Sequence, residues 1–265
     1  MLQELQPIEI HVQFHNLKIY VCDIVIVSQQ RLLLCDYFKE VVLLVNTDLG
    51  EVLSVVQRLA GINSICMIQD DLAALALARD KEVQNIKVKD DRMKLGKSVK
   101  VSGIIASLDA INDTMAVLYT APLAAEVISL MGKVIHRTDN KTAGKEIFKY
   151  PEFLTVSPDL HHIFINDSGT KAVSMLNTEL QLLKNFPHHN GLTLAYRMAV
   201  FDENQLLVTD YTNKIVHLDP CTGKMTVILD EKDGLDKPSA LAYCHETKTL
   251  YVVNGTTTIK RYRRQ

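Results

Sequence analysis

The stretch NQLLVTDYTNKIVHLDPCTG, residues 204–223, carries the clearest structural signal in the sequence. It begins with a short apolar run, passes through the polar segment 210–213, continues with a second apolar run at 214–218 and ends on Gly223. Short apolar runs separated by Asp, Asn, Pro and Gly predict two β-strands joined by a tight turn. Asp210 stands where the first strand ends, and a carboxylate there can accept hydrogen bonds from backbone N–H groups about two residues further along.

The same plan recurs along the whole chain. Five further segments repeat it: residues 31–50, 72–88, 114–134, 162–180 and 249–262. The residues that open the turns are Asp36, Arg79, Thr120, Asp167, Asp210 and Asn254. Successive members of this series are 43, 41, 47, 43 and 44 positions apart. A period of about 40–45 residues is typical of one four-stranded blade of a β-propeller.

Each repeat has room for two more strands, one before and one after the central pair. The sequence therefore predicts an all-β fold, a six-bladed β-propeller with four antiparallel strands per blade in one domain, 1–265. The blades are expected at 22–61, 62–103, 104–148, 149–190, 191–237 and 238–265. The sixth repeat contains three strands, so we expect an N-terminal strand within 8–20 to complete it and close the ring. Two stacked β-sandwiches would also contain many short strands and are the alternative fold.

Composition narrows the class of protein. Hydrophobic residues make up 47% and charged residues 23%, as in a folded globular chain, and the net charge is −2. This charge balance argues against a protein that mainly binds DNA phosphates. No apolar run approaches the roughly 20 residues of a membrane helix, so we expect no membrane span. Five scattered cysteines without a Cys-x-x-Cys pair, together with an N-terminus unlike a signal peptide, indicate reduced thiols and a cytoplasmic location.

The recurring turn residues are interpreted as structural. They are Asp36, Asp167, Asp210, Asn213 and Asn254. A single metal site or catalytic site does not need the same residue in several blades. A residue that closes a turn is needed once in every blade.

The Asp-x-x-Asn turn at 210–213, its flanking apolar doublets and the Gly that closes 219–223 resemble NHL-type repeats. The arrangement is similar to the TolB-like six-bladed propellers, in particular the C-terminal propeller of invertebrate tripartite-motif proteins. The likeness runs from Cys22 onward and is best over 32–50 and 206–223. It implies a substrate-recognition module of a ubiquitin ligase. The RING, B-box and coiled-coil segments of such a ligase are absent from this sequence, so we expect a fragment or short form that is not itself an enzyme.

Two other functions stay open as alternatives. Residues 157–167 resemble a strand-turn-strand segment of sugar lactonases, which suggests a metal-dependent hydrolase, but the expected oxygen ligands are missing. Single-stranded RNA binding would need a basic face with stacking aromatic residues, and the dense basic cluster is confined to 260–264. No Gly-x-Ser-x-Gly motif or phosphate loop is present, so we expect no catalytic residues, metal or cofactor.

Protein recognition is the leading hypothesis. Turns between the second and third strands of each blade are expected on one rim of the propeller, joined there by inter-blade loops. The candidate partner-binding residues in these turns and loops are Tyr37, Phe38, Lys39, Tyr119, Pro122, Phe186, His188, His189, Tyr211 and Lys214.

Overall fold

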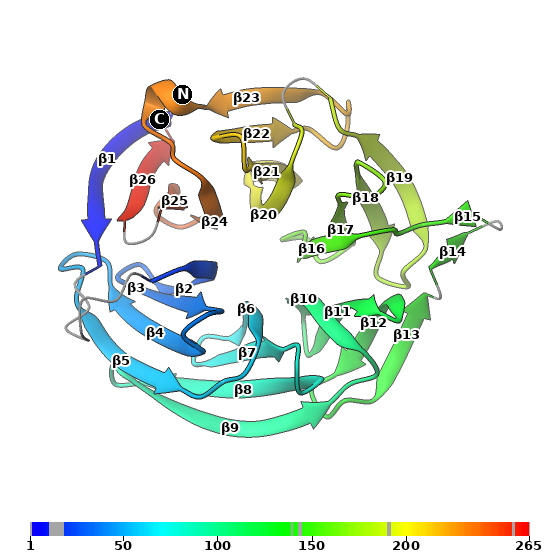
Figure 1. Cartoon of the computed structure of the whole chain (residues 1–265), viewed down its shortest axis with the longest axis horizontal. Helices are drawn as coiled ribbons and strands as arrows, with labels where there is room; N and C mark the ends of the chain where they lie inside the picture. The colour runs from blue at the N-terminus through cyan, green and yellow to red at the C-terminus, as the bar shows by residue number, and fades with distance from the viewer. Residues whose placement is uncertain are drawn as a thin grey trace.

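Six four-stranded antiparallel sheets surround a central axis in the computed structural model of the chain (Figure 1). The structure describes residues 2–10, 19–138, 140–142, 145–189, 192–255 and 258–264. The predicted six-bladed β-propeller is confirmed. Within the described residues, no helix is long and apolar enough to cross a membrane.

The blades follow one another along the chain, and in blades 1 to 5 the innermost strand comes first. Blade 1 contains β2 (Val21–Ser28), β3 (Arg31–Asp36), β4 (Val41–Asn46) and β5 (Val52–Gln57). Blade 2 contains β6 (Ile62–Gln69), β7 (Leu72–Leu77), β8 (Glu82–Lys89) and β9 (Arg92–Lys100). Blade 3 contains β10 (Ile104–Ile111), β11 (Thr114–Ala121), β12 (Leu123–Ser129) and β13 (Val134–Thr138).

The second half of the chain repeats this order. Blade 4 contains β16 (Pro151–Val156), β17 (His162–Asp167), β18 (Ala172–Asn177) and β19 (Leu182–Pro187). Blade 5 contains β20 (Ala195–Phe201), β21 (Gln205–Asp210), β22 (Lys214–Leu218) and β23 (Met225–Leu229). Blade 6 contains β24 (Pro238–Cys244), β25 (Thr249–Asn254), β26 (Thr258–Arg264) and β1 (Leu2–Glu9). A short hairpin, β14 (Lys141–Thr142) with β15 (Lys145–Glu146), and the 3-10 turns η1 (Asp202–Asn204) and η2 (Glu231–Asp233) lie in the connections.

The hydrophobic core consists of six layers, each between two neighbouring blades. Every buried cluster combines residues from adjacent sheets, including the cluster that joins blade 6 to blade 1. Because both faces of a blade are covered, its second strand reads as a continuous apolar run rather than an alternation. In the Leu-Ala-Ala-Leu-Ala-Leu segment of β7, Ala73, Ala74 and Ala76 are 0% exposed. This explains why such a weak repeat in the sequence still forms a blade.

The N-terminal strand closes the propeller ring, but it starts earlier than expected. β1 pairs antiparallel with β26, with Leu2 opposite Arg264 and Glu9 opposite Thr258. Leu2 and Ile8 pack into the core layers beside blade 6, which places the closing strand at Leu2–Glu9 rather than at 8–20. Residues 11–18 of the expected strand lie outside the described residues.

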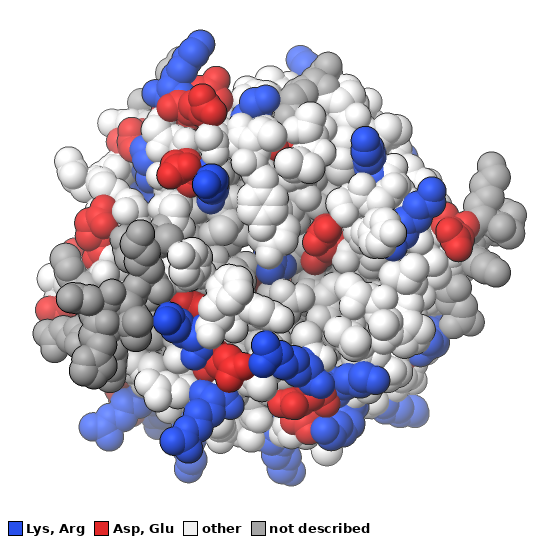
Figure 2. Space-filling model, in the orientation of Figure 1, with Lys and Arg blue, Asp and Glu red and all other residues white. Residues whose placement is uncertain are grey.

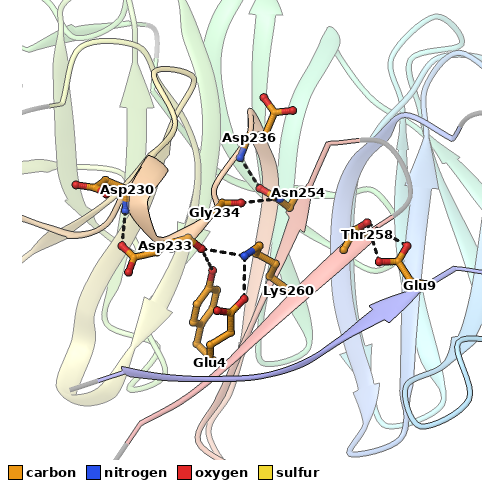
Figure 3. A network of polar contacts seen from close by, with 10 residues as sticks. Glu4, Glu9, Asp230, Asp233, Gly234, Asp236, Asn254, Thr258 and Lys260 are labelled. Atoms are coloured by element: carbon orange, nitrogen blue, oxygen red, sulfur yellow. Dashed lines mark hydrogen bonds and ion pairs between the residues drawn. The ribbon is translucent and has the colours of Figure 1, made fainter.

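Polar contacts support this closure (Figure 3). Lys260 Nζ donates to Glu4 Oε1 at 2.8 Å and to the Asp233 carbonyl oxygen at 2.9 Å. Thr258 Oγ1 donates to the Glu9 carboxylate at 3.1 Å. The first and last strands of the chain are thus joined by side-chain contacts as well as by the backbone ladder.

The two rims of the propeller are defined by the strand ends and turns that lie at each. The innermost strand of each blade begins at one rim, where the turns between second and third strands also lie; we call it the aromatic rim. The turns between first and second strands, and between third and fourth strands, lie at the opposite rim. This distinction follows from the antiparallel order of every sheet.

Candidate functional site

The turn aspartates connect each turn to the segment that enters the innermost strand of the same blade. The buried carboxylate of Asp210 accepts hydrogen bonds from the backbone N–H groups of Thr193 at 2.5 Å, Leu194 at 2.9 Å and Thr212 at 2.7 Å. Burial raises the pKa of Asp210, but the hydrogen bonds from Thr212 and its neighbours outweigh this and hold the pKa below its usual range. This carboxylate is a structural acceptor.

The corresponding residues of other blades make equivalent contacts. Asp36 accepts from the N–H groups of Tyr20 and Lys39, both at 2.8 Å. Asp167 accepts from Lys149 at 2.7 Å and from Gly169 and Thr170 at 2.8 Å.

The two asparagines of the predicted set behave differently from each other. Asn254 accepts from the Asp236 N–H at 2.7 Å and donates to the Gly234 carbonyl at 3.1 Å, so it does in blade 6 what the aspartates do in theirs. Asn213, in a left-handed turn conformation with φ of 62°, accepts instead from the Lys237 N–H at 2.7 Å. It therefore joins blade 5 to the entrance of blade 6.

Three of the predicted binding residues lie in the turn between β3 and β4. Phe38 is 73% exposed, and its aromatic ring meets those of Tyr20 and Tyr37 edge-on, with centroids 5.6 and 5.5 Å apart. Lys39 is exposed beside them. In blade 5, Tyr211 is 44% exposed and stacks on Tyr196 with centroids 4.7 Å apart.

Two predicted binding residues belong to the core, and the expectation that they are exposed is wrong. Tyr119 is 0% exposed: it faces the layer between blades 2 and 3, and its hydroxyl donates to Glu126 Oε2 at 2.7 Å. Phe186 is 2% exposed because it lies in β19 rather than in a loop, where it packs between blades 4 and 5.

The remaining predicted residues are spread along the same rim. Pro122 is exposed, and Lys214 is half-buried opposite Asp210 at the start of β22. His188 is half-buried, which lowers the pKa of its imidazole, and His189 is exposed with Nδ1 2.7 Å from the Pro187 carbonyl oxygen.

A cavity at the aromatic rim gathers residues from blades 1, 2, 5 and 6. Its volume is about 640 Å³, within the range of small-ligand sites. It is lined by Tyr20, Val21, Cys22, Tyr37, Phe38, Asn63, Tyr196, Tyr211, Asp236, Lys237, Ser239 and Gly255. The structure therefore brings the predicted residues Tyr37, Phe38 and Tyr211 together with Tyr20 and Tyr196, which the sequence reasoning did not single out.

Arg197 contacts three residues that line this cavity, Cys22, Asn63 and Tyr196, and reaches across the central axis. The side chain is 1% exposed and extends from β20 to blades 1 and 2. Its Nε donates to the Cys22 carbonyl and its Nη2 to the Asn63 carbonyl, both at 2.9 Å. Nη2 also lies 3.2 Å from the Tyr196 hydroxyl, whereas Nη1 has no hydrogen-bond partner among the residues that the structure describes.

A guanidinium in this place was not expected from the sequence. The available signal was a lone arginine at the start of the otherwise apolar segment 197–201 assigned to an innermost strand. Its charge faces aromatic surface, with the guanidinium carbon 4.5 Å from the Tyr196 centroid and 4.7 Å from that of Phe153. These contacts stabilise the cation without neutralising it.

Two further carboxylates, the buried Asp23 and the half-buried Asp109, lie on innermost strands and line a cavity of about 290 Å³ toward the opposite rim. Asp23 of blade 1 accepts from Ser64 Oγ at 2.8 Å and from the Ile65 N–H at 2.9 Å in blade 2. Burial raises the pKa of Asp23, with nearby Arg197 opposing the shift. These contacts connect neighbouring blades rather than one turn.

Asp109 of blade 3 repeats this arrangement with blade 4. It accepts from Thr155 Oγ1 at 3.1 Å and from the Val156 N–H at 2.9 Å. Burial raises the pKa of Asp109 to about 6, although these hydrogen bonds oppose the shift. In the described part of the chain, His, Cys, Asp and Glu side chains form no group of three or more that could hold a metal ion.

Most charged side chains in Figure 2 lie toward the periphery of the face, although one basic group is visible at the centre and an acidic group near it. Lys, Arg, Asp and Glu gather toward the lower edge, over β5, β8 and β9. In blade 2 the basic groups are interleaved with acidic ones, as in the ion pairs Lys100–Glu82 at 2.6 Å and Lys87–Asp71 at 3.2 Å.

Comparison with known proteins supports the fold alone. No protein-family model and no curated protein matches the sequence. A functionally unknown protein from Desulfotomaculum acetoxidans DSM 771 is similar with a TM-score of 0.63 and 14% identity, over 84% of this chain and 72% of that chain. Hydrazine synthase from Kuenenia stuttgartiensis is similar with a TM-score of 0.64 and 13% identity, over 94% of this chain and 99% of that one. At such identities the likeness shows a shared propeller architecture and no shared activity.

Proposed function

We propose that the protein is a non-catalytic interaction module that binds a protein partner at its aromatic rim. The observation that carries the proposal is the placement of exposed apolar side chains. Twelve large hydrophobic residues are exposed in the described part of the chain, and half of them lie at this rim. The six are Tyr20, Phe38, Ile104, Tyr150, Leu194 and Tyr211. Exposed apolar and aromatic residues collected on one surface are typical of protein-binding sites.

The backbone holds these side chains in place. Tyr20, Tyr150 and Leu194 each stand directly before an innermost strand, and each donates its N–H to the turn aspartate of its blade. A side chain on such a fixed backbone loses little conformational freedom when a partner binds, so more of the contact energy appears as affinity. The structural role of the aspartates thus supports the proposed function of their neighbours.

The resemblance to tripartite-motif propellers suggests a finer proposal, in which the partner is a substrate selected for ubiquitination. The repeat pattern supports it. In this proposal the propeller supplies recognition, and transfer of ubiquitin requires a RING segment.

The test compares two double variants that each replace two exposed hydrophobic residues by serine. Phe38→Ser with Tyr150→Ser removes side chains 73% and 71% exposed at the aromatic rim. Leu49→Ser with Met131→Ser removes side chains 62% and 76% exposed in turns of the opposite rim. Proteins captured from a cell lysate are quantified for the wild type and for both variants.

We expect partners retained by the wild type and the opposite-rim variant to fall at least tenfold with the aromatic-rim variant. Equal retention by both variants would contradict the proposal. Salt-sensitive retention of the wild type on single-stranded RNA, lost in the same aromatic-rim variant, would favour the RNA alternative instead. Unchanged unfolding midpoints in both variants establish that the comparison reports binding.

A further inference from the structure

We propose that the cavity at the aromatic rim binds a carboxylate carried on an aromatic or aliphatic group, with Arg197 Nη1 as the donor that receives it. The inference deepens the proposed function and rests on it for the choice of the aromatic rim as the binding face. Two sources can supply this chemistry: a free small carboxylic acid, or the C-terminal residue of a protein partner.

The first argument is the unpaired charge of Arg197. A guanidinium carries five N–H donors and stays protonated in proteins. Nε and Nη2 are engaged by Cys22, Asn63 and Tyr196, and the donors on Nη1 are free although the side chain is 1% exposed. Buried cations are normally paired with an anion or fully hydrogen-bonded, and this one is neither.

The carboxylate of Asp23 does not supply the missing partner. Its oxygens accept from Ser64 and Ile65 of blade 2 and from the Ile24 N–H, and it makes no hydrogen bond with Arg197. Burial also raises its pKa, which reduces the negative charge that it offers. An anion that enters from the aromatic rim would complete the pairing.

The second argument is the position and shape of the cavity. The three residues that hold the guanidinium, Cys22, Asn63 and Tyr196, all line the cavity wall or floor. Tyr37 and Tyr211 line the same cavity. A ligand with a carboxylate at one end and an apolar body at the other matches an aromatic lining with a guanidinium directly behind it.

The mouth of the cavity adds little net charge. Asp236 and Lys237 line it side by side with opposite charges. Discrimination between a carboxylate and a neutral analogue therefore depends on Arg197. The single free nitrogen of the guanidinium can donate to one carboxylate. A hydrogen bond to an ionised carboxylate is stronger than one to a neutral acceptor such as an amide.

The test uses phenylacetate and its neutral analogue phenylacetamide, measured by isothermal titration calorimetry on the full chain. We expect phenylacetate to bind the wild type at least tenfold more tightly. In Arg197→Met this preference should vanish, while in the control Lys237→Met it should change less than threefold. A parallel pair, N-acetylphenylalanine and its C-terminal amide, measures whether a chain terminus is accepted as well as a free acid.

Equal binding of the acid and the amide by the wild type, or no binding of either acid, would overturn the proposal. If Arg197→Met fails to fold, crystals of the wild type with 4-bromophenylacetate decide the question through the anomalous signal of bromine. A carboxylate next to Arg197 would support the proposal, and bromine elsewhere or absent would refute it. Loss of partner capture in the aromatic-rim variant without acid binding would leave the proposed function standing while this inference fails.

Discussion

The turn aspartates and the innermost-strand aspartates are both largely withdrawn from solvent, yet their pKa values shift in opposite directions. Asp210 accepts three backbone N–H groups within its own blade, and these hydrogen bonds bring its pKa below the usual range. Asp109 accepts from the next blade along the ring, and burial raises its pKa to about 6. The same residue type therefore stabilises one blade in the first case and an interface between blades in the second.

The difference shows that burial alone does not determine the state of a carboxylate. Where enough donors converge, the ionised form is favoured despite desolvation; where fewer do, the protonated form gains. The turn set also recurs with the period of the repeat, whereas Asp23 and Asp109 occur in alternate blades. Four measurements test this contrast, ordered by the size of the expected effect.

Asp210→Ala should cause the largest loss. It removes the charged acceptor of three partly buried hydrogen bonds from the N–H groups of Thr193, Leu194 and Thr212, and at about 1–1.5 kcal/mol for each we expect a loss of about 4 kcal/mol. Urea unfolding measures the change. The control Asp219→Ala removes an aspartate from the exposed turn of the same blade, where the Cys221 N–H is left to water, and should cost about 1 kcal/mol or less. Similar losses in the two variants would contradict a special role for Asp210.

Asp109 should make the stability depend on pH in the direction opposite to Asp210. Its pKa is about 6 in the folded state against 3.8 for an ordinary aspartate, so between these values the folded state binds more protons than the unfolded state. Stability should therefore fall as the pH rises from about 4 to about 6, by about 3 kcal/mol, and then stay level. Asp109→Asn should lack this part of the decline when unfolding is followed across that pH range. A variant with the wild-type pH profile would show that the proton is held elsewhere.

Ser64→Ala tests the contact between blades 1 and 2. The substitution removes the hydroxyl that donates to Asp23 Oδ2 at 2.8 Å in a fully buried place, so we expect a loss of about 1–2 kcal/mol. Burial raises the pKa of Asp23, so the loss should grow as the pH rises through the range in which this carboxyl ionises. A loss independent of pH would indicate that Asp23 stays protonated throughout.

Asn254→Asp should have the smallest effect. Blade 6 carries an asparagine where blades 1, 4 and 5 carry aspartate, and its amide donates to the Gly234 carbonyl at 3.1 Å. A carboxylate would keep the acceptor for the Asp236 N–H but face that carbonyl with negative charge, at a cost of about 0.5–1 kcal/mol. Thermal unfolding at pH 7 measures it. A gain in stability would mean that the aspartate is preferred in every blade.

Much of the fold could be predicted because the repeat is encoded locally. Asp36, Asp167 and Asp210 end strands at a constant period, and the apolar runs around them reveal three strands of each blade. The position of the closing strand was harder to predict from the sequence. A register shift between Leu5 and Ile8 interrupts the alternation of β1, so its apolar residues do not show the period of two that marks a strand.

The site could be predicted only in part, because it depends on side-chain direction and on contacts across the central axis. A shift of one residue turns a side chain from solvent to core, which is why Tyr119 and Phe186 were assigned to the surface while Phe38 and Tyr211 were placed correctly at the rim. Arg197 meets Cys22 and Asn63, more than 130 positions away in the chain. No local pattern reports a contact between residues that far apart.

The pairing of Leu2 with Arg264 determines how the molecule responds to force. Both ends of the chain lie at the same end of one antiparallel strand pair, as the adjacent N and C labels in Figure 1 show. Tension applied to the two termini would load the β1–β26 ladder one rung at a time, as in opening a zipper, instead of shearing all its hydrogen bonds together. Pulled from its ends, the propeller should open at this seam at low force, before any of the five blades built from continuous chain gives way.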